Sequence, residues 1–146
     1  MSNYRGVIMV IINEVEVREG LYYNKEHSWL KIEDGEVKIG ITDHAQKQLK
    51  EIVVVDLLDS GDDVSQGDSF GEVESVKTVS DLISPISGTI TEVNSELEDS
   101  PELVNESPYD EGWMIVVEPS DLDAELENLM SFDDAVEFYE EAAKEE

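Results

Sequence analysis

Short segments in which apolar and polar residues alternate, or in which β-branched residues run together, dominate the first two thirds of the chain. Residues 36–41 alternate with period two, which is typical of a half-buried strand. Residues 52–58 are β-branched and apolar, which suits a buried strand. Further strands are predicted at 71–74, 79–84, 88–93 and 113–118, with turns at Asp34-Gly35, Gly61 and Gly67. Many short strands with closely spaced turns predict a β-sandwich or barrel.

Helical patterns are confined to two regions of the chain. Thr42 is placed to N-cap a short helix over residues 43–50, with Asp43 near its positive end. Ser131 is placed to cap a second helix near the C-terminus. Its apolar stripe, expected to pack against the sheet, consists of Phe132, Val136 and either Phe138 or Tyr139. The sequence therefore predicts a mainly β fold with peripheral helices.

The N-terminal 19 residues differ from the rest because they contain the apolar run 7–12. This run is too short to span a bilayer and lacks a signal-peptide cleavage pattern, so we expect a cytoplasmic protein. We predict that residues 1–19 form an extension in which the run adds a strand to a sheet edge or pairs between two molecules. The sequence leaves open whether translation starts at Met1 or at Met9.

The chain is strongly acidic, with 37 Asp and Glu against 9 Lys and Arg, giving a net charge of −28 over 146 residues. Such a charge repels a phosphate backbone, which excludes a nucleic-acid binder, and it disfavours docking on anionic lipid. Screening by high salt and pairing with basic partner surfaces both remain compatible with it. The chain has no cysteine, so disulfides, thiolate nucleophiles and thiolate metal sites are absent.

One lysine stands out against this acidic background. Lys77 is the only lysine or arginine between Glu51 and Ala143. It lies centrally in the run Glu72-Val73-Glu74-Ser75-Val76-Lys77-Thr78-Val79-Ser80. Two interpretations follow from this context: a surface lysine that neutralises its acidic neighbours, or an amine kept as a covalent attachment point.

Several motifs, in order along the chain, support the second interpretation. They are Gly40-Ile41-Thr42-Asp43-His44-Ala45-Gln46, Glu74-Ser75-Val76-Lys77, Ser84-Pro85-Ile86-Ser87-Gly88, Leu103-Val104-Asn105 and Pro108-Tyr109-Asp110-Glu111-Gly112-Trp113. Together they resemble the H protein of the glycine cleavage system, a lipoyl carrier of the lipoyl/biotinyl-domain family, over residues 20–146. The resemblance implies a barrel-sandwich hybrid of two small antiparallel sheets with C-terminal helices. It also implies that Lys77 lies on an exposed hairpin, although Val76-Lys77 lacks the glycine or asparagine that two-residue hairpins favour.

The resemblance further implies a carrier that is not itself an enzyme. Lipoate joined to Lys77 would shuttle the aminomethyl group of glycine from glycine decarboxylase, a pyridoxal-phosphate enzyme, to the folate-dependent aminomethyltransferase. Dihydrolipoyl dehydrogenase would then reoxidise the arm. A lipoate ligase or a lipoyl/octanoyl transferase would attach it. The residues expected to guide that enzyme or surround the arm are Glu74, Ser75, Val76 and Asp81.

The resemblance also implies a cleft that shelters the loaded arm. Its candidate residues are Glu26, His27, Ser28 and Trp29, together with Asp81 four positions after the lysine. The family has His-Glu-Trp where this chain has His27-Ser28-Trp29. Because Glu26 would share a strand face with Ser28, we hypothesise that Glu26 replaces the missing carboxylate. Thr78, where the family has alanine, is a second departure that bears on ligase recognition.

Three alternatives compete with this function. A biotinylated carboxylase carrier is disfavoured because Val76 and Thr78 stand where that family has methionine. A lipoate relay or another lipoyl carrier would use the same lysine, and an unmodified binding module would not use it at all.

The acidic loop 59–68 lacks the spacing of an EF-hand, so no metal site is expected there.

Overall fold

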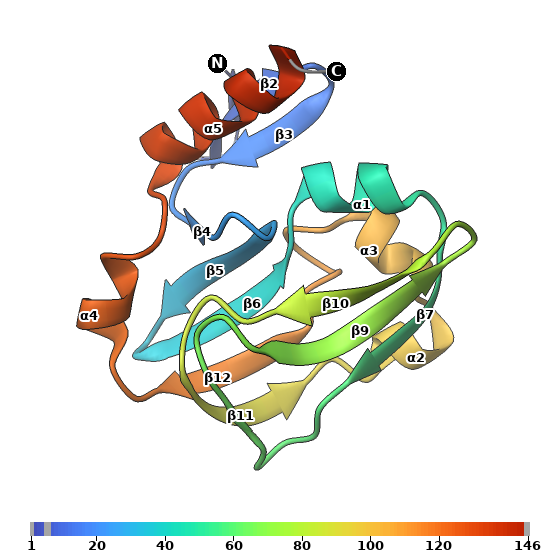
Figure 1. Cartoon of the computed structure of the whole chain (residues 1–146), viewed down its shortest axis with the longest axis vertical. Helices are drawn as coiled ribbons and strands as arrows, with labels where there is room; N and C mark the ends of the chain where they lie inside the picture. The colour runs from blue at the N-terminus through green and yellow to red at the C-terminus, as the bar shows by residue number, and fades with distance from the viewer. Residues whose placement is uncertain (1, 5–6, 145–146) are drawn as a thin grey trace.

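The computed structural model describes residues 2–4 and 7–144, and two antiparallel sheets share its main apolar core (Figure 1). The larger sheet contains, in spatial order, β4 (Tyr22–Tyr23), β5 (Ser28–Glu33), β6 (Glu36–Ile41), β12 (Ile115–Pro119), β11 (Gly88–Val93) and β8 (Asp63–Val64). The smaller sheet contains β10 (Val79–Ile83), β9 (Ser69–Ser75) and β7 (Ile52–Leu57). The predicted mainly β barrel-sandwich is confirmed.

The two sheets bury complementary apolar faces. Leu30, Ile39 and Ile115 of the larger sheet and Val73 of the smaller one are fully buried in one cluster. The turn predicted at Asp34-Gly35 joins β5 to β6 with positive φ at both residues, as a two-residue hairpin requires. Apolar residues at alternate positions of these strands point to the same side, and the turns bring the strands together, so their apolar side chains form this core.

Helices lie outside the sheets, as predicted. The first is α1 (Asp43–Leu49), where the Thr42 side chain accepts a hydrogen bond from the Ala45 amide at 3.1 Å. The others are α2 (Glu96–Asp99), α3 (Glu102–Glu106), α4 (Leu122–Leu126) and α5 (Phe132–Lys144). The one-turn helices α2 and α3 were not predicted because they are too short to show a helical apolar stripe. No helix in the described part of the chain has the length and apolar composition needed to cross a membrane.

A third sheet, which the sequence did not predict, is formed at the N-terminus by β1 (Ser2–Tyr4), β2 (Val7–Ile12) and β3 (Val15–Arg18). The apolar run 7–12 is its central strand and is paired with neither of the two larger sheets. Asn13 and Glu14 both have positive φ and form the two-residue turn between β2 and β3. That local turn pairs the run within its own chain.

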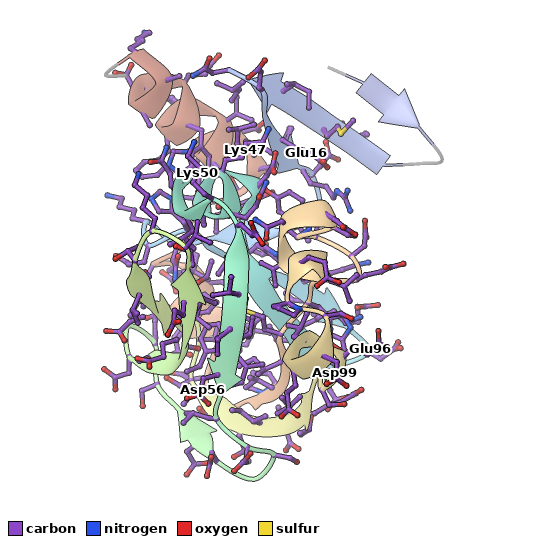
Figure 2. All side chains as sticks on the ribbon, turned by 90° about the vertical axis from the view of Figure 1, so that its right-hand side faces the viewer. Glu16, Lys47, Lys50, Asp56, Glu96 and Asp99 are labelled. Atoms are coloured by element: carbon purple, nitrogen blue, oxygen red, sulfur yellow. The ribbon has the colours of Figure 1, made fainter. Side chains whose placement is uncertain are left out.

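The third sheet docks on α1 through the outer edge of β3. The Glu16 amide donates to Asp43 Oδ2 at 2.8 Å, and the Tyr109 hydroxyl donates to the Glu16 carbonyl oxygen at 2.7 Å. Lys47 of α1 donates to the Glu14 carbonyl oxygen, and Figure 2 shows Lys47 next to Glu16 at this junction. The side chains of Asp43, Lys47 and Tyr109 thus satisfy backbone groups that an edge strand would otherwise leave open.

A second apolar cluster joins the two ends of the chain. It contains Val17, Leu21, Tyr23, Trp29, Tyr109, Ala135 and Tyr139. Helix α5 therefore packs against β2 and β3 of the third sheet and against β4, so the predicted packing of its apolar stripe on a sheet holds only for β4 among the strands of the two larger sheets. In Figure 1, α5 lies beside β2 and β3 at one end of the molecule.

Candidate functional site

The β9–β10 hairpin carries Lys77 at its tip, and a serine hydroxyl closes the turn. The Ser75 amide donates to the Thr78 carbonyl oxygen at 2.8 Å. Ser75 Oγ accepts from the amides of Lys77 at 3.1 Å and of Thr78 at 3.0 Å. Neither Val76 nor Lys77 has a positive φ. The expected objection to valine in this turn therefore does not apply, because the turn needs no left-handed residue.

The amine of Lys77 is available for chemistry. The side chain is exposed, and its Nζ takes part in none of the hydrogen bonds or ion pairs between described residues. The flanking Val76 is 66% exposed. No carboxylate among the described residues is paired with the Lys77 ammonium. This favours the interpretation of Lys77 as an attachment point over that of a surface lysine that neutralises its acidic neighbours.

A cleft of about 140 Å³ lies between β10, α1 and the β4–β5 turn. Four of the predicted site residues, Glu26, His27, Ser28 and Asp81, lie on its wall. Its other lining residues are Ile41, Ala45, Gln48, Leu49, Val73, Ser80 and Leu82. The cleft thus combines an apolar wall with two exposed carboxylates, Glu26 and Asp81.

His27 is held in the neutral form at one side of the cleft. Burial, and then the neighbouring His44 ring, lower the pKa of His27 to about 4. The two rings lie 4.5 Å apart, and the Tyr139 hydroxyl of α5 lies 3.0 Å from His27 Nδ1. Burial raises the pKa of Tyr139 to about 12, so the hydroxyl keeps its proton. At neutral pH His27 therefore presents an uncharged imidazole to the cleft, and Tyr139 contacts that ring from behind the cleft wall.

Three predicted site residues occupy positions that the sequence did not indicate. Glu26 lies in the turn between β4 and β5, not on a strand, and His27 after it has a φ of 72°. The premise that Glu26 and Ser28 share a strand face was therefore wrong. Ser28 is fully buried and donates to the Ile83 carbonyl oxygen at 2.7 Å. Trp29 is not among the residues lining the cleft; it is fully buried and donates to the Pro108 carbonyl oxygen.

Sequence reasoning missed the contribution of α1 to the cleft. Ala45, Gln48 and Leu49 line it from one face of that helix. The signal was present, since residues three and four apart on a capped helix share a face. It was not connected to Lys77 because 28 or more residues of chain separate them.

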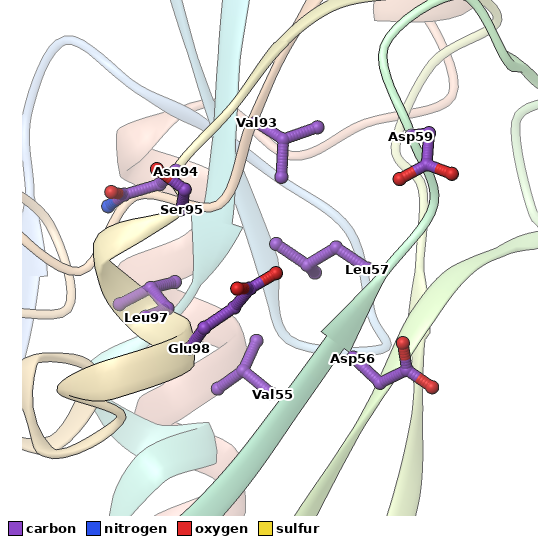
Figure 3. A pocket seen from close by; sticks show the side chains of 9 residues that line it. All are labelled: Val55, Asp56, Leu57, Asp59, Val93, Asn94, Ser95, Leu97 and Glu98. Atoms are coloured by element: carbon purple, nitrogen blue, oxygen red, sulfur yellow. The ribbon is translucent and has the colours of Figure 1, made fainter.

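A second pocket, of about 240 Å³, lies between β7 and α2 (Figure 3). Its apolar wall is formed by Val55, Leu57, Val93 and Leu97, and the acids at its rim are Asp56, Asp59 and Glu98. Figure 3 shows the Glu98 carboxylate reaching toward the apolar wall, whereas that of Asp56 points away from it. The acids make the pocket unsuited to an anionic ligand.

Among residues 2–4 and 7–144, no group of three or more His, Asp or Glu is arranged to hold a metal ion.

These features define a class of protein. An antiparallel barrel-sandwich that exposes one lysine at a hairpin tip, beside a small cleft, is the design of a lipoyl/biotinyl carrier domain. The sequence model of the family described as "Glycine cleavage H-protein" matches residues 21–142. The chain belongs to the glycine cleavage H-protein family. This assignment contradicts the biotin-carrier alternative.

Individual relatives agree with the family assignment. The chain is 56% identical to the glycine cleavage system H protein of Bacillus pumilus over 126 residues, covering 86% of this chain and 95% of that protein. It is 51% identical to a probable H protein of Thermococcus gammatolerans over 123 residues, covering 84% and 91%. The crystal structure of an H protein from Mycobacterium marinum superposes with a TM-score of 0.67 at 44% identity, covering 69% and 84%. The family's proteins carry lipoate and catalyse no step themselves, so this chain is a carrier subunit, not an enzyme.

Proposed function

We propose that lipoate is joined by an amide bond to the ε-amine of Lys77, and that the chain carries the aminomethyl group of glycine between the enzymes of the glycine cleavage system. The observation that supports this most directly is the exposed, unpaired amine at the tip of the β9–β10 hairpin. Family membership supplies the cofactor class. When bound, lipoate supplies a disulfide that accepts the aminomethyl group at one sulfur.

The residues near Lys77 fit such an arm. Ser75 fixes the hairpin by accepting two amide hydrogen bonds, so the lysine projects from a defined position. Ile41, Ala45 and Leu82 line the neighbouring cleft and suit a hydrocarbon chain. This combination of an attachment amine and an adjacent apolar wall supports the assignment of Lys77 to the arm.

The cleft also suits a protonated amine. Carboxylates of Glu26 and Asp81 can accept charge-assisted hydrogen bonds from an ammonium group. A neutral His27 adds no competing positive charge. We assign Glu26, His27, Ser28 and Asp81 to the cleft that shelters the loaded arm, with Ser28 acting on its shape through its bond to Ile83. Trp29 does not line the cleft; we assign it a structural role, as a buried residue next to Ser28 in β5.

The partners follow from this role. They are glycine decarboxylase, which loads the arm, the folate-dependent aminomethyltransferase, which unloads it, and dihydrolipoyl dehydrogenase, which reoxidises it. A lipoate ligase or a lipoyl/octanoyl transferase would modify Lys77. Glu74 and Val76 lie on the exposed side of the hairpin and are available to that enzyme. The cytoplasmic location stays a prediction from the sequence.

Intact-mass measurement tests the attachment site. After incubation with lipoate, ATP and a lipoate ligase, the wild-type chain is expected to gain the mass of one lipoyl group. Lys77→Ala is expected to gain none, because Lys77 is the attachment point. Lys31→Ala removes another exposed lysine and should load like wild type. A folded wild-type chain that gains no mass would contradict the proposal and favour an unmodified binding module.

A second experiment tests the role of Glu26. Glu26→Gln is expected to release the aminomethyl group from the loaded arm up to about fivefold faster than wild type, since one exposed charge interaction is lost. Glu19→Gln, another exposed glutamate in a turn, serves as the matched control. Release of the group is followed as ammonia formed over time. Equal rates for Glu26→Gln and wild type would remove Glu26 from the cleft's function.

A further inference from the structure

The third sheet contacts both helices that reach the cleft. Within the described part of the chain it contributes no residue to the cleft lining itself. Its three strands precede residue 21, where the match to the family model begins. It packs against α1 through β3 and against α5 through β2 and β3. The positions of α1 and α5 therefore depend in part on a sheet that lies outside the matched residues.

Helix α1 has one face toward the third sheet and the opposite face toward the cleft. Asp43 and Lys47 are four residues apart and share the first of these faces. Asp43 Oδ2 accepts from the Glu16 amide at 2.8 Å, and Lys47 donates to the Glu14 carbonyl oxygen (Figure 2). The opposite face lines the cleft and consists of Ala45, Gln48 and Leu49. A shift of α1 away from β3 would therefore move one wall of the cleft.

The position of α1 depends on such contacts because the helix is short. It has seven residues, Asp43–Leu49, and helices shorter than about 12 residues are marginal on their own in water. Its tertiary hydrogen bonds come from two neighbours. Asn105 of α3 donates to the Gln46 side chain at 3.0 Å, and β3 bonds to Asp43 and Lys47. Loss of the contact with β3 would leave α1 held mainly from the side of α3.

A second connection runs from the third sheet through α5 to His27. Helix α5 lies beside β2 and β3 (Figure 1), and Val17 of β3 is fully buried in the apolar cluster that they share. The hydroxyl of Tyr139, a buried residue of α5, lies 3.0 Å from His27 Nδ1. His27 has a φ of 72°, a conformation that persists in a residue other than glycine only where its surroundings hold it. The third sheet therefore supports two walls of the cleft.

We infer that the third sheet is a positioning element for the cleft: by holding α1 and α5 in place, it keeps the cleft closed around the loaded arm and slows the loss of the aminomethyl group to water. The inference rests on the proposed function, because the arm belongs to Lys77. In the described part of the chain, no strand of the third sheet pairs with the sheet that carries Lys77. Weakening the third sheet should therefore change how long the group is kept, and not how fast Lys77 is modified.

The loss that a closed cleft slows is a hydrolysis. The carbon of the aminomethyl group breaks its bonds to sulfur and nitrogen and combines with the oxygen of one water molecule to give formaldehyde. The two hydrogens of that water end on the sulfur, as a thiol, and on the nitrogen, as ammonium. No oxidant or reductant takes part, so the access of water to the cleft controls the rate.

Val17→Ala tests the inference by weakening the packing of β3 against α5. The matched control is Val64→Ala, the same truncation of a buried valine on β8, at the far edge of the larger sheet from β4. In the unmodified chain, amide hydrogen exchange over residues 43–49 is expected to be about tenfold faster in Val17→Ala than in wild type. Val64→Ala is expected to exchange like wild type over the same residues.

The lifetime of the loaded arm is the second measurement. Each chain is loaded by glycine decarboxylase with glycine and separated from the enzyme, and ammonia is then followed over time. Val17→Ala is expected to release ammonia about fivefold faster than wild type, because α1 and α5 open more often. Val64→Ala is expected to release it at the wild-type rate. Both variants are expected to gain one lipoyl mass from a lipoate ligase as fast as wild type.

A surface variant keeps the test decisive if Val17→Ala does not fold. Lys47→Ala removes the bond to the Glu14 carbonyl oxygen and the ion pair with Asp43, and leaves the buried cluster intact. It is expected to release ammonia about twofold faster than wild type. Its control is Lys50→Ala, which truncates another exposed lysine at the end of the same helix and is expected to match wild type.

Two results would overturn the inference. One is ammonia release at the wild-type rate in Lys47→Ala and in folded Val17→Ala. The other is an equal acceleration in the matched controls, which would show a general effect of lost stability. Faster exchange over residues 43–49 without faster release also contradicts it, because α1 would then move without any consequence for the arm.

Failure of the proposed function gives a different result. If Lys77 is not the attachment site, the wild-type chain gains no lipoyl mass, and the inference falls with the proposed function. If the attachment is right and the role of the third sheet is wrong, all variants gain the lipoyl mass and release ammonia at the wild-type rate.

Discussion

A Lys77→Arg chain is expected to support no glycine cleavage above background when it replaces the wild-type chain in a reconstituted system with all partner enzymes. Arginine keeps the positive charge but is not acylated by a lipoate ligase, so the chain carries no arm. Tethering normally holds the arm at about millimolar effective concentration at each docked active site. The measured quantity is carbon dioxide released from labelled glycine, and the loss should be at least about a hundredfold.

The control is Lys31→Arg, which makes the same substitution at an exposed lysine of β5. It is expected to support the wild-type rate. Free lipoamide added to the Lys77→Arg reaction should restore only a small part of the activity, because it lacks the tether. Substantial glycine cleavage by Lys77→Arg without lipoamide would mean that the arm is attached elsewhere or is not required.

Gly88→Ala is expected to lower the free energy of unfolding by about 3 kcal/mol, as overpacking against backbone does. Gly88 begins β11 directly after the Ser84-Pro85-Ile86-Ser87 segment. A Cβ at this position would overlap the Glu118 carbonyl oxygen of β12 and lie 2.7 Å from Val117 Cγ1. Strand β12 is central in the six-stranded sheet and cannot retreat without breaking its pairing with β6. Urea denaturation measures the change.

A glycine can be required because a Cβ would clash with neighbouring atoms or because its backbone has a positive φ, and Gly61→Ala measures the second cost alone. Nothing lies within 4 Å of a Cβ at Gly61, but its φ is +97°. This variant should therefore cost only the strain of a left-handed backbone, about 1 kcal/mol. Equal costs for Gly61→Ala and Gly88→Ala would refute the steric explanation for the glycine at position 88.

Local patterns in the sequence were sufficient for most of the fold. Alternation predicted β6, and a short apolar segment between turns predicted β11, both with the bounds that the structure shows. Thr42 marked the start of α1 through its side-chain oxygen. These elements depend on neighbours within a few residues, and such dependence leaves a periodic or capping signal.

The docking of the third sheet on α1, and the contact of α5 with His27 beside the cleft, have no comparable pattern in the sequence. The Glu16–Asp43 hydrogen bond joins residues 27 apart, and the His27–Tyr139 contact joins residues 112 apart. Neither pair repeats with any period. Tertiary packing alone brings α5 beside the β4–β5 turn, so the environment of His27 and its lowered pKa were invisible in the sequence.

The hairpin tip shows a different limit. Two-residue turn rules describe backbones with positive φ, and Val76-Lys77 does not satisfy them. The structure uses the Ser75 hydroxyl to accept the amides that a tighter backbone turn would satisfy. A serine is compatible with many local structures, so its presence alone did not indicate this one. The resemblance to the family, not turn chemistry, placed the hairpin.

Because Lys77 has no lysine or arginine near it in the sequence, trypsin digestion can distinguish acylated from unmodified chains. Trypsin cuts after a free lysine but not after an acylated one, and no other lysine or arginine lies between Glu51 and Ala143. A denatured digest therefore yields fragments 51–77 and 78–144 from the free chain. The acylated chain yields a single fragment, 51–144. The ratio of these fragments reports what proportion of molecules carries the arm in any preparation, without an antibody or a label.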